Sequence, residues 1–229
     1  MTERAAHAST AAEVAAGLSV DPAQGLSAGE AAVRGASLGP NELAPARREP
    51  LWRIVPDAAT EPFVVMLAAA GVLAVLLGET RDGLLVLLGL LPIVGADVVT
   101  EYRGERAIEA LRAASAPTAR VRRDGVVATV PAASLVPGDV VLFQAGDVVP
   151  ADARISRADR LLLDRSVLTG ESLPEPGAVD ADPADVPVTQ RRSVAYAGTS
   201  VVGGRGEGIV TAIGAATEFG AIAGQLSTR

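Results

Sequence analysis

Two long apolar runs dominate the hydrophobicity pattern of the chain. Residues 63–78 contain no charged side chain, and neither do residues 83–96. A helix of about sixteen residues reaches about 24 Å, slightly less than the bilayer hydrocarbon thickness of about 30 Å. The polar segment between the runs, residues 79–82, leaves room only for a tight connection. The pattern therefore predicts two antiparallel helices, at about 58–78 and 83–100.

The distribution of charge around these runs favours a hairpin that spans a membrane. Arginines precede the first run and follow the second, and only Arg81 lies between them. Positive residues concentrate on the cytoplasmic side, so both ends of the hairpin are predicted to be cytoplasmic. A buried helical hairpin in a soluble protein is the alternative. Asp97, at the end of the second run, is either an intramembrane ion ligand or a side chain that reaches the interface.

The region before the apolar runs carries signals for short helices. Two hydroxyl–carboxylate pairs have the spacing of a capping box: Thr10 with Glu13, and Ser27 with Glu30. Gly39 and Pro40 predict the end of the second helix, because glycine adopts the left-handed cap and proline cannot continue a helix. His7, the only histidine, is expected to lie in a disordered terminus.

After residue 116 the pattern changes to short segments separated by turn residues. Asp124-Gly125 suits a type I′ turn between strands at 119–123 and 126–130. Further strands are expected at 140–143, 153–155 and 161–163, and a hairpin joining 199–202 to 208–211 through a glycine-rich turn. The acidic segment 180–187 is expected to be a solvated loop, and Thr217 to cap a helix that ends near Gln225. This spacing of short strands predicts a compact β domain.

Composition argues against several classes of function. A net charge of -7, without a basic and aromatic stretch, argues against a nucleic-acid partner. The absence of cysteine excludes disulfides and thiolate metal sites. All 20 basic residues are arginine, so a Walker phosphate-binding loop, which requires lysine, is excluded as well. We expect this segment to bind no cofactor and no metal ion.

Several motifs occur in the order and approximate spacing of the actuator domain of P-type ATPases, the ion pumps that cycle through an aspartyl-phosphate. They lie at 137–140, 146–152, 163–174, 197–201 and 214–220. The third contains Thr169-Gly170-Glu171-Ser172. Upstream, residues 25–43 resemble the amino-terminal region of cation-transporting members, most of all the calcium-pump-like branch. The resemblance covers most of residues 20–226.

This resemblance implies an α+β membrane protein in three parts. Residues 1–50 would be a cytoplasmic N-terminal helical segment. Residues 51–116 would be the two-helix transmembrane hairpin with a cytoplasmic stalk. Residues 117–229 would be a distorted β jelly-roll-like actuator domain and a following helix. The expected location is the cell membrane, as a multi-pass protein with both ends cytoplasmic.

The resemblance also implies which residues carry the chemistry. The actuator loop of the family drives hydrolysis of the aspartyl-phosphate, and here it corresponds to Thr169, Gly170, Glu171 and Ser172. Glu171 would orient and activate water, and Gly170 would let the backbone approach the phosphate. The hydroxyls of Thr169 and Ser172 would hold the loop. The chain departs from the family after the loop, where Glu175 follows Pro174 in place of the common valine.

The phosphorylated aspartate of the family lies in an Asp-Lys-Thr-Gly-Thr motif, which a chain without lysine does not contain. We therefore expect the segment to be part of an ATP-hydrolysing pump and to be inactive alone. The complete pump would use ATP and Mg²⁺, with its phosphorylation and nucleotide-binding domains downstream or on a separate polypeptide. The other expected partners are the lipid bilayer and a transported cation. Calcium is the first candidate for this cation, and a proton is the second. The alternative is a short non-enzymatic membrane-anchored regulator, or a split subunit of a complete pump.

Overall fold

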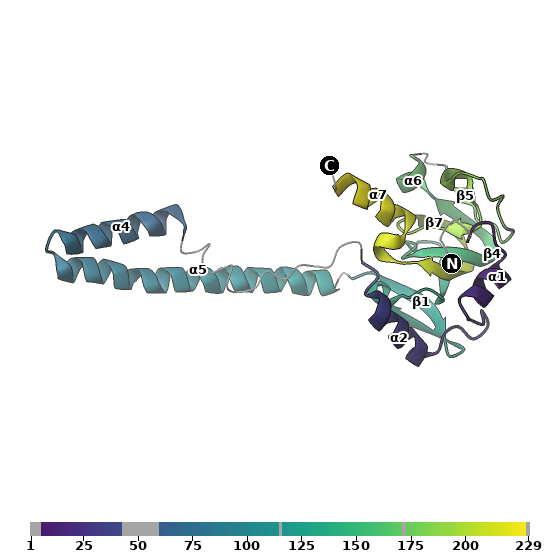
Figure 1. Cartoon of the computed structure of the whole chain (residues 1–229), viewed down its shortest axis with the longest axis horizontal. Helices are drawn as coiled ribbons and strands as arrows, with labels where there is room; N and C mark the ends of the chain where they lie inside the picture. The colour runs from purple at the N-terminus through teal and green to yellow at the C-terminus, as the bar shows by residue number, and fades with distance from the viewer. Residues whose placement is uncertain (1–5, 43–59, 115, 171–172, 228–229) are drawn as a thin grey trace. The chain divides into compact units, whose positions relative to one another are not determined.

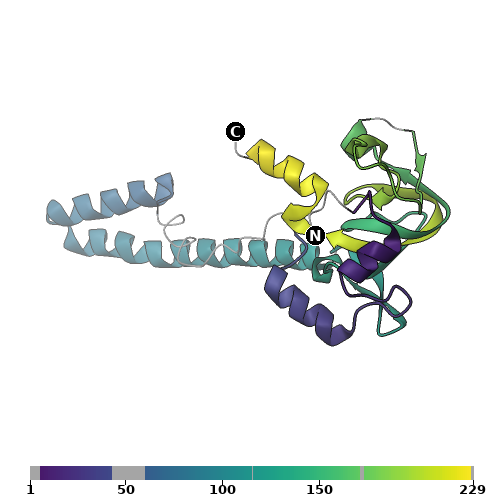
Figure 2. The same ribbon diagram turned by 45° about the vertical axis from the view of Figure 1, so that its right-hand side comes forward.

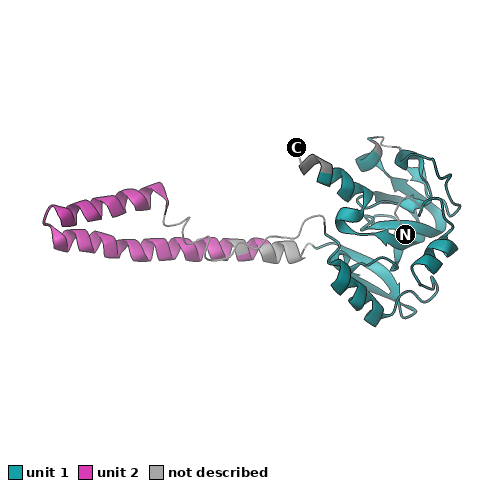
Figure 3. Ribbon diagram, viewed as in Figure 1, with its two compact units in different colours: residues 1–45, 116–229 teal, residues 46–115 magenta. Residues whose placement is uncertain are grey.

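The computed structural model describes residues 6–42, 60–114, 116–170 and 173–227, which belong to two compact units (Figure 1 and Figure 3). One unit comprises residues 1–45 together with 116–229, and the other comprises residues 46–115. The amino-terminal segment, which we had set apart as a region of its own, thus shares a unit with the β domain.

An antiparallel sheet of seven strands forms the centre of the first unit. The strands are β1 (Thr118–Arg123), β2 (Val126–Pro131), β3 (Val140–Gln144), β4 (Asp152–Asp164), β5 (Glu175–Pro176), β6 (Val194–Ala195) and β7 (Ser200–Ala212). Their order is β2-β1-β3-β7-β4-β5, and β6 pairs with β4 off this path. The mixed helix and sheet class is confirmed, whereas the jelly-roll description stays a prediction.

Helices and short 3₁₀ turns complete the described chain. The helices are α1 (Ala11–Gly17), α2 (Ala28–Leu38), α4 (Pro62–Leu76), α5 (Thr80–Ala114), α6 (Ser166–Thr169) and α7 (Glu218–Ser227). The 3₁₀ turns are η2 (Ala132–Ser134), η3 (Val188–Gln190) and η4 (Gly214–Ala216). Thr217 Oγ1 accepts the Gly220 amide at 3.0 Å, so the predicted cap of α7 is confirmed.

The predicted hairpin between β1 and β2 is confirmed. Asp124 and Gly125 have φ angles of 50° and 74°, and a type I′ turn requires a positive φ at both central residues. The strands pair in register from Thr118 opposite Pro131 to Arg123 opposite Val126. This local turn therefore fixes the pairing of both strands.

The prediction of a second hairpin is wrong, because β7 is one continuous strand between β3 and β4. Its glycines allow neighbouring backbone to approach closely. A Cβ atom on Gly204 would lie 2.0 Å from the carbonyl oxygen of Arg160, and one on Gly206 would lie 2.6 Å from that of Arg157. The glycine-rich segment is thus a place of close packing within a strand.

The strands predicted at 153–155 and 161–163 are likewise parts of one strand, β4. Its pairing with β7 shifts register at several points, including the stretch between Asp159 and Leu162. Arg160 adopts a φ of 50° within this stretch. Such bulges bend and twist a strand without ending it, so the polar interruption in the sequence marks an irregularity and not a turn.

The first capping box is confirmed and the second is half formed. Thr10 Oγ1 accepts the Glu13 amide at 3.2 Å, while the Glu13 carboxylate accepts the Thr10 amide at 2.7 Å. The Thr10 amide, and then the Thr10 hydroxyl, which donates to the same carboxylate at 2.9 Å, lower the pKa of Glu13. Ser27 Oγ accepts the Glu30 amide at 3.1 Å, but the Glu30 carboxylate pairs with Arg34 instead.

Replacement of this cap tests its contribution to stability. Thr10→Ala is expected to lower the free energy of unfolding by about 1 kcal/mol, because the Glu13 amide loses its acceptor. The measurement is urea denaturation of the detergent-solubilised chain, followed by far-UV circular dichroism. Ser37→Ala removes an exposed hydroxyl of α2 and serves as the control, with an expected change within about 0.5 kcal/mol. Equal effects of the two substitutions would contradict a stabilising cap.

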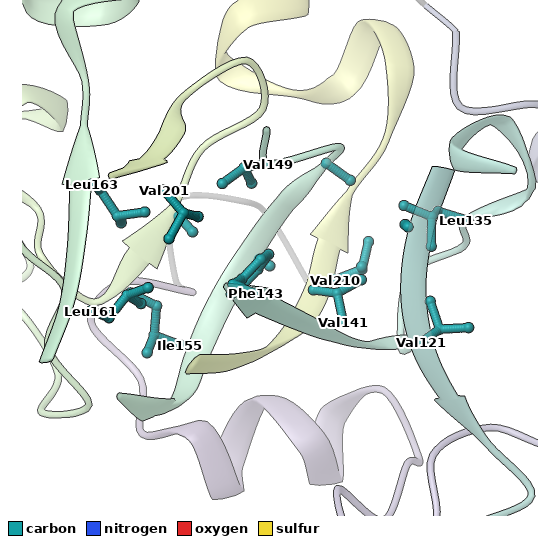
Figure 4. Close-up of a cluster of buried hydrophobic side chains, with 14 of the residues drawn as sticks. Val121, Leu135, Val141, Phe143, Val149, Ile155, Leu161, Leu163, Val201 and Val210 are labelled. Atoms are coloured by element: carbon teal, nitrogen blue, oxygen red, sulfur yellow. The ribbon is translucent and has the colours of Figure 1, made fainter. Parts of the chain in front are cut away.

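Buried side chains of the strands form most of the hydrophobic core, and a second cluster extends it to the N-terminal helices. Figure 4 shows the larger cluster, which includes Val121, Val141, Ile155 and Val210 from four strands. A second cluster joins α1 and α2 to the sheet, and both views show these helices against it (Figure 1 and Figure 2). Its members are Val14, Ala15, Val20, Leu26, Ala31, Val136, Val140 and Ile209. Burial of these side chains explains why the N-terminal segment is part of this unit.

The expectation that His7 lies in a disordered terminus is wrong. His7 is only 2% exposed, and its Nε2 atom lies 3.3 Å from the carbonyl oxygen of Ala184. Its own carbonyl oxygen accepts the Asp182 amide at 2.8 Å and the Ser193 hydroxyl at 3.1 Å. The acidic segment therefore holds the N-terminal segment, and is more than a solvated loop.

Asp182 is the anchor of this acidic segment. Its carboxylate accepts the Ser193 hydroxyl at 2.6 Å and the Ser193 amide at 2.9 Å. Burial acts to raise the pKa of Asp182, but the hydrogen bonds from Ser193 and Arg192 outweigh it, so the pKa is lowered. The carboxylate thus stays ionised and keeps the segment attached to β6.

Arg154 lies at the centre of the same region and is fully buried. Its guanidinium donates only to backbone carbonyls: those of Ser9 at 2.9 Å, Ile155 at 2.6 Å, Ser193 at 3.1 Å and Val179 at 2.8 Å. Burial lowers the pKa of Arg154, and the nearby charges of Asp182 and Asp180 oppose this effect. One side chain therefore connects the N-terminal segment, β4, and the segments around residues 179 and 193.

The second unit consists of α4 and α5, which pack against each other at small residues. A Cβ atom on Gly83 would lie 2.6 Å from the carbonyl oxygen of Gly71. Within the described part of the chain, residues Thr80–Ile108 of α5 are long and apolar enough to cross a membrane, with a mean hydropathy of 2.2 over an 18-residue stretch, whereas α4 is shorter. The pair of membrane spans stays a prediction, and Asp97 is exposed on α5.

Candidate functional site

The predicted actuator loop is the connection between β4 and β5. β4 ends at Asp164, and Leu163 beside it is paired with Glu175 in β5, so the chain leaves the sheet after Asp164 and returns to it at a neighbouring position. Val167 and Leu173 are 56% and 81% exposed. The loop therefore projects from a fixed base and presents apolar side chains to solvent.

Local hydrogen bonds build the first half of the loop. Asp164 Oδ1 accepts the Ser166 amide at 2.9 Å, and the Gly170 amide donates to the Ser166 carbonyl at 2.8 Å, which closes the single turn of α6. The Ser166 amide, and then its hydroxyl, lower the pKa of Asp164. An aspartate that accepts the amide two residues ahead is a common way to begin a turn.

Two of the four predicted residues have described positions. Thr169 is the last residue of α6, and Gly170 caps that helix with a φ of 74°. Glu171 and Ser172 lie outside the described residues. A Cβ atom on Gly170 would meet nothing within 4 Å, so glycine is required here for its backbone angle and not by a contact within this chain. The chemical roles of the four residues stay predictions.

Arg165, directly before α6, has a structural role that we did not predict from the sequence. It is only 2% exposed, and its guanidinium donates to the carbonyl oxygens of Arg191 and, at 3.3 Å, Val194. The Nη1 atom that donates to the Arg191 carbonyl also lies 3.7 Å from Oε2 of Glu175. The sequence signal for this role is a pair of opposite charges, Arg165 before and Glu175 after Thr169-Gly170-Glu171-Ser172.

The carboxylate of Glu175 favours the charged form of Arg165. Burial lowers the pKa of Arg165, and the carboxylate of Glu175 is the strongest of the effects that oppose the lowering. Oε2 of Glu175 is itself buried and accepts no hydrogen bond from the described residues. The guanidinium is therefore the positive charge that this oxygen faces.

No other charged cluster in the described chain offers an evident ligand site. Among residues 6–42, 60–114, 116–170 and 173–227, no group of three histidine or acidic side chains could hold a metal ion. An open groove along β3 and β7 contains Arg120 and Arg205, but these pair with Asp147 at 3.1 Å and Asp159 at 3.0 Å. Two of the three arginines that line the groove are thus paired with carboxylates.

Two protein families match this chain. Residues 113–227 match the P-type ATPase actuator domain, and residues 6–74 match the N-terminus of cation transporter ATPases. These ranges together include almost all described residues of the first unit and part of the second.

Curated relatives agree with these matches. A calcium-transporting ATPase of Listeria monocytogenes is 38% identical over 205 residues, which is 90% of this chain and 23% of that protein. A probable cation-transporting ATPase F of Mycobacterium tuberculosis is 42% identical over 218 residues, or 94% of this chain and 24% of that protein. Calcium-transporting ATPase type 2C member 1 of Bos taurus is 34% identical to this chain, and the match covers 24% of that protein.

The chain spans about a quarter of the length of these relatives. The part that it spans contains the cation-transporter N-terminus and the β domain with the loop between β4 and β5. The actuator match, the N-terminal match and the relatives all point the same way: the chain belongs to the P-type ATPases, and its relatives include calcium-transporting members.

Proposed function

We propose that this chain is the N-terminal part of a pump that moves cations across a membrane at the expense of ATP. In this pump, the loop that contains Glu171 drives hydrolysis of an aspartyl-phosphate. The observation that carries the proposal is that the motif begins at the last residue of α6, Thr169, with Gly170 as its cap, and that the sheet pairing of Glu175 follows three residues after the motif. Calcium is the first candidate for the cation, in line with the names of the relatives.

The chemistry explains why a carboxylate on such a loop is suitable. Attack of water on an acyl-phosphate needs an oriented nucleophile and an acceptor for its proton. Glu171 supplies both functions when the loop is docked onto the phosphorylated aspartate. The exposed side chains of Val167 and Leu173 support docking onto another domain, because apolar surface next to a polar tip favours a protein contact.

The domains that bind ATP and Mg²⁺ and carry the phosphorylated aspartate lie outside this segment, which has no lysine and hence no Asp-Lys-Thr-Gly-Thr motif. In the complete pump, movement of the actuator domain acts on α4 and α5 and thereby couples phosphate hydrolysis to ion access. The continuity of α5 from Thr80 to Ala114 supports this role, since one helix can transmit force over its whole length.

Phosphorylation of the full-length protein tests the proposed function. Incubation with labelled ATP should give an acid-stable phosphoprotein that hydroxylamine cleaves, and its formation should depend on the transported cation. Failure to form this product with any cation, calcium included, would contradict the proposal. An immunoblot of source membranes against residues 118–226 addresses the alternative: a single band at 23.1 kDa would favour a regulator or a split subunit.

A labelling experiment tests the membrane topology. In intact cells, a cysteine introduced by Thr80→Cys is expected to react with an impermeant maleimide, because Thr80 lies at the connection between α4 and α5. A cysteine introduced by Ser37→Cys should react only after permeabilisation. The native chain has no cysteine, so the background is absent. Equal labelling of both positions in a soluble extract would support the buried hairpin.

A further inference from the structure

We propose that Arg165 and Glu175 are positioning residues, which together fix the base of the actuator loop and thereby set the approach of Glu171 to the aspartyl-phosphate. This inference rests on the proposed function of the loop. Neither residue would touch the reacting atoms. Their effect would come from holding the two ends of the loop at a defined separation and angle.

The geometry of Arg165 suits a clamp. Its guanidinium bonds to the carbonyl oxygens of Arg191 and Val194, which belong to the segment that contains η3 and β6. It therefore fixes the start of the loop to the sheet from one side. The carboxylate of Glu175, 3.7 Å away, approaches from the strand to which the loop returns.

Burial of Arg165 makes this pair consequential, although the Glu175 side chain is 36% exposed. Arg165 is 2% exposed, and burial of a charge is unfavourable unless an opposite charge or hydrogen bonds compensate for it. Removal of the Glu175 charge takes away a carboxylate that offsets the burial of the guanidinium. The arginine is then expected to move toward solvent and to take the start of α6 with it.

The position of the pair explains why a small movement would matter. Arg165 directly precedes α6, and Glu175 follows the tip of the loop after Leu173 and Pro174. Rotation at such a base displaces the tip by more than it displaces the base. Since a misplacement of about 1 Å can slow a reaction by about 10²-fold, a clamp remote from the phosphate can control the rate.

Hydrogen exchange of the chain itself tests the clamp without any assumption about function. In Glu175→Gln, the amides of Leu168 and Gly170 are expected to exchange about tenfold faster, because the turn that they close loses its anchor. Glu207→Gln is the matched control, since Glu207 pairs with Arg122 through bonds of 2.8 and 3.0 Å away from this loop. Unchanged exchange in Glu175→Gln, or an equal increase in Glu207→Gln, would overturn the proposal.

Phosphoenzyme kinetics of the full-length pump test the consequence. Glu175→Gln is expected to slow decay of the phosphoenzyme about tenfold and to leave its formation from ATP unchanged, a split that general destabilisation would not produce. The double variant Arg165→Gln/Glu175→Gln should decay no more slowly than the slower single variant, since both remove the same contact.

Glu171→Gln, measured in parallel, separates this inference from the proposed function. Slow decay in Glu171→Gln combined with normal decay in Glu175→Gln would overturn the positioning role and leave the function of the loop intact. Normal decay in Glu171→Gln would contradict the proposed function and, with it, any positioning for catalysis. Additive slowing in the double variant would also overturn the pairing of Arg165 with Glu175.

Discussion

Glu171→Gln in the full-length pump is expected to slow hydrolysis of the phosphoenzyme by about 10²- to 10⁴-fold, the range typical for loss of a general base. Glutamine has the same shape and can still hold a water molecule by a hydrogen bond, but it cannot accept the proton. Formation of the phosphoenzyme should be unaffected, so the phosphorylated species accumulates. The measurement is the decay of labelled phosphoprotein after a chase with unlabelled ATP.

The control for this experiment is another glutamate of the same unit. Glu30 lies on α2, where its carboxylate pairs with Arg34, and its side chain is 44% exposed. Glu30→Gln should leave the decay rate within about twofold of the native value, because exposed ion pairs contribute little. A native decay rate in Glu171→Gln would contradict the catalytic role of the loop and favour the regulator.

Arg154→Met is expected to lower the free energy of unfolding by about 3–5 kcal/mol, the range for breaking a buried charged network. Methionine fills much of the volume but removes the guanidinium donor from four backbone carbonyls, those of Ser9, Ile155, Val179 and Ser193, of which Ser193 keeps the Ile155 amide at 2.8 Å. Arg154→Lys should recover only a small part of the loss, since one ammonium cannot reach all four. Urea denaturation of the detergent-solubilised chain, followed by circular dichroism, measures both variants.

Arg205→Met provides the matched control for Arg154→Met. The Arg205 side chain is 75% exposed and pairs with Asp159 at 3.0 Å, so its replacement should change the unfolding free energy by less than about 1 kcal/mol. Arg154→Met is also expected to release the N-terminal segment, because Arg154 donates to the Ser9 carbonyl. Native stability of Arg154→Met would show that the carbonyls find other donors.

Features decided by neighbouring residues were predictable from the sequence. The Thr10–Glu13 capping box, the Asp124-Gly125 turn and the Thr217 cap depend on groups within four residues of one another. Propensity and spacing describe such interactions well. The loop motif was recognised for a similar reason, because its residues are contiguous in the sequence.

The errors arose where a distant partner decided the conformation. A glycine-rich segment is as suitable for a turn as for close packing of strands, and the carbonyl of Arg160 beside Gly204 selects the second. His7 looked like part of a disordered terminus because its partners, Asp182 and Ser193, are far along the chain. Neither choice is encoded in the local pattern.

The sequence by itself determined the family, the apolar helices and the tetrapeptide that contains Glu171, since each is a contiguous pattern. Only the tertiary structure decided that Arg154 connects four segments and that Arg165 meets Glu175 at the base of the loop. A buried guanidinium is stable only where carbonyls and carboxylates from separate strands converge on it. That convergence is a property of the packed sheet and of no single segment.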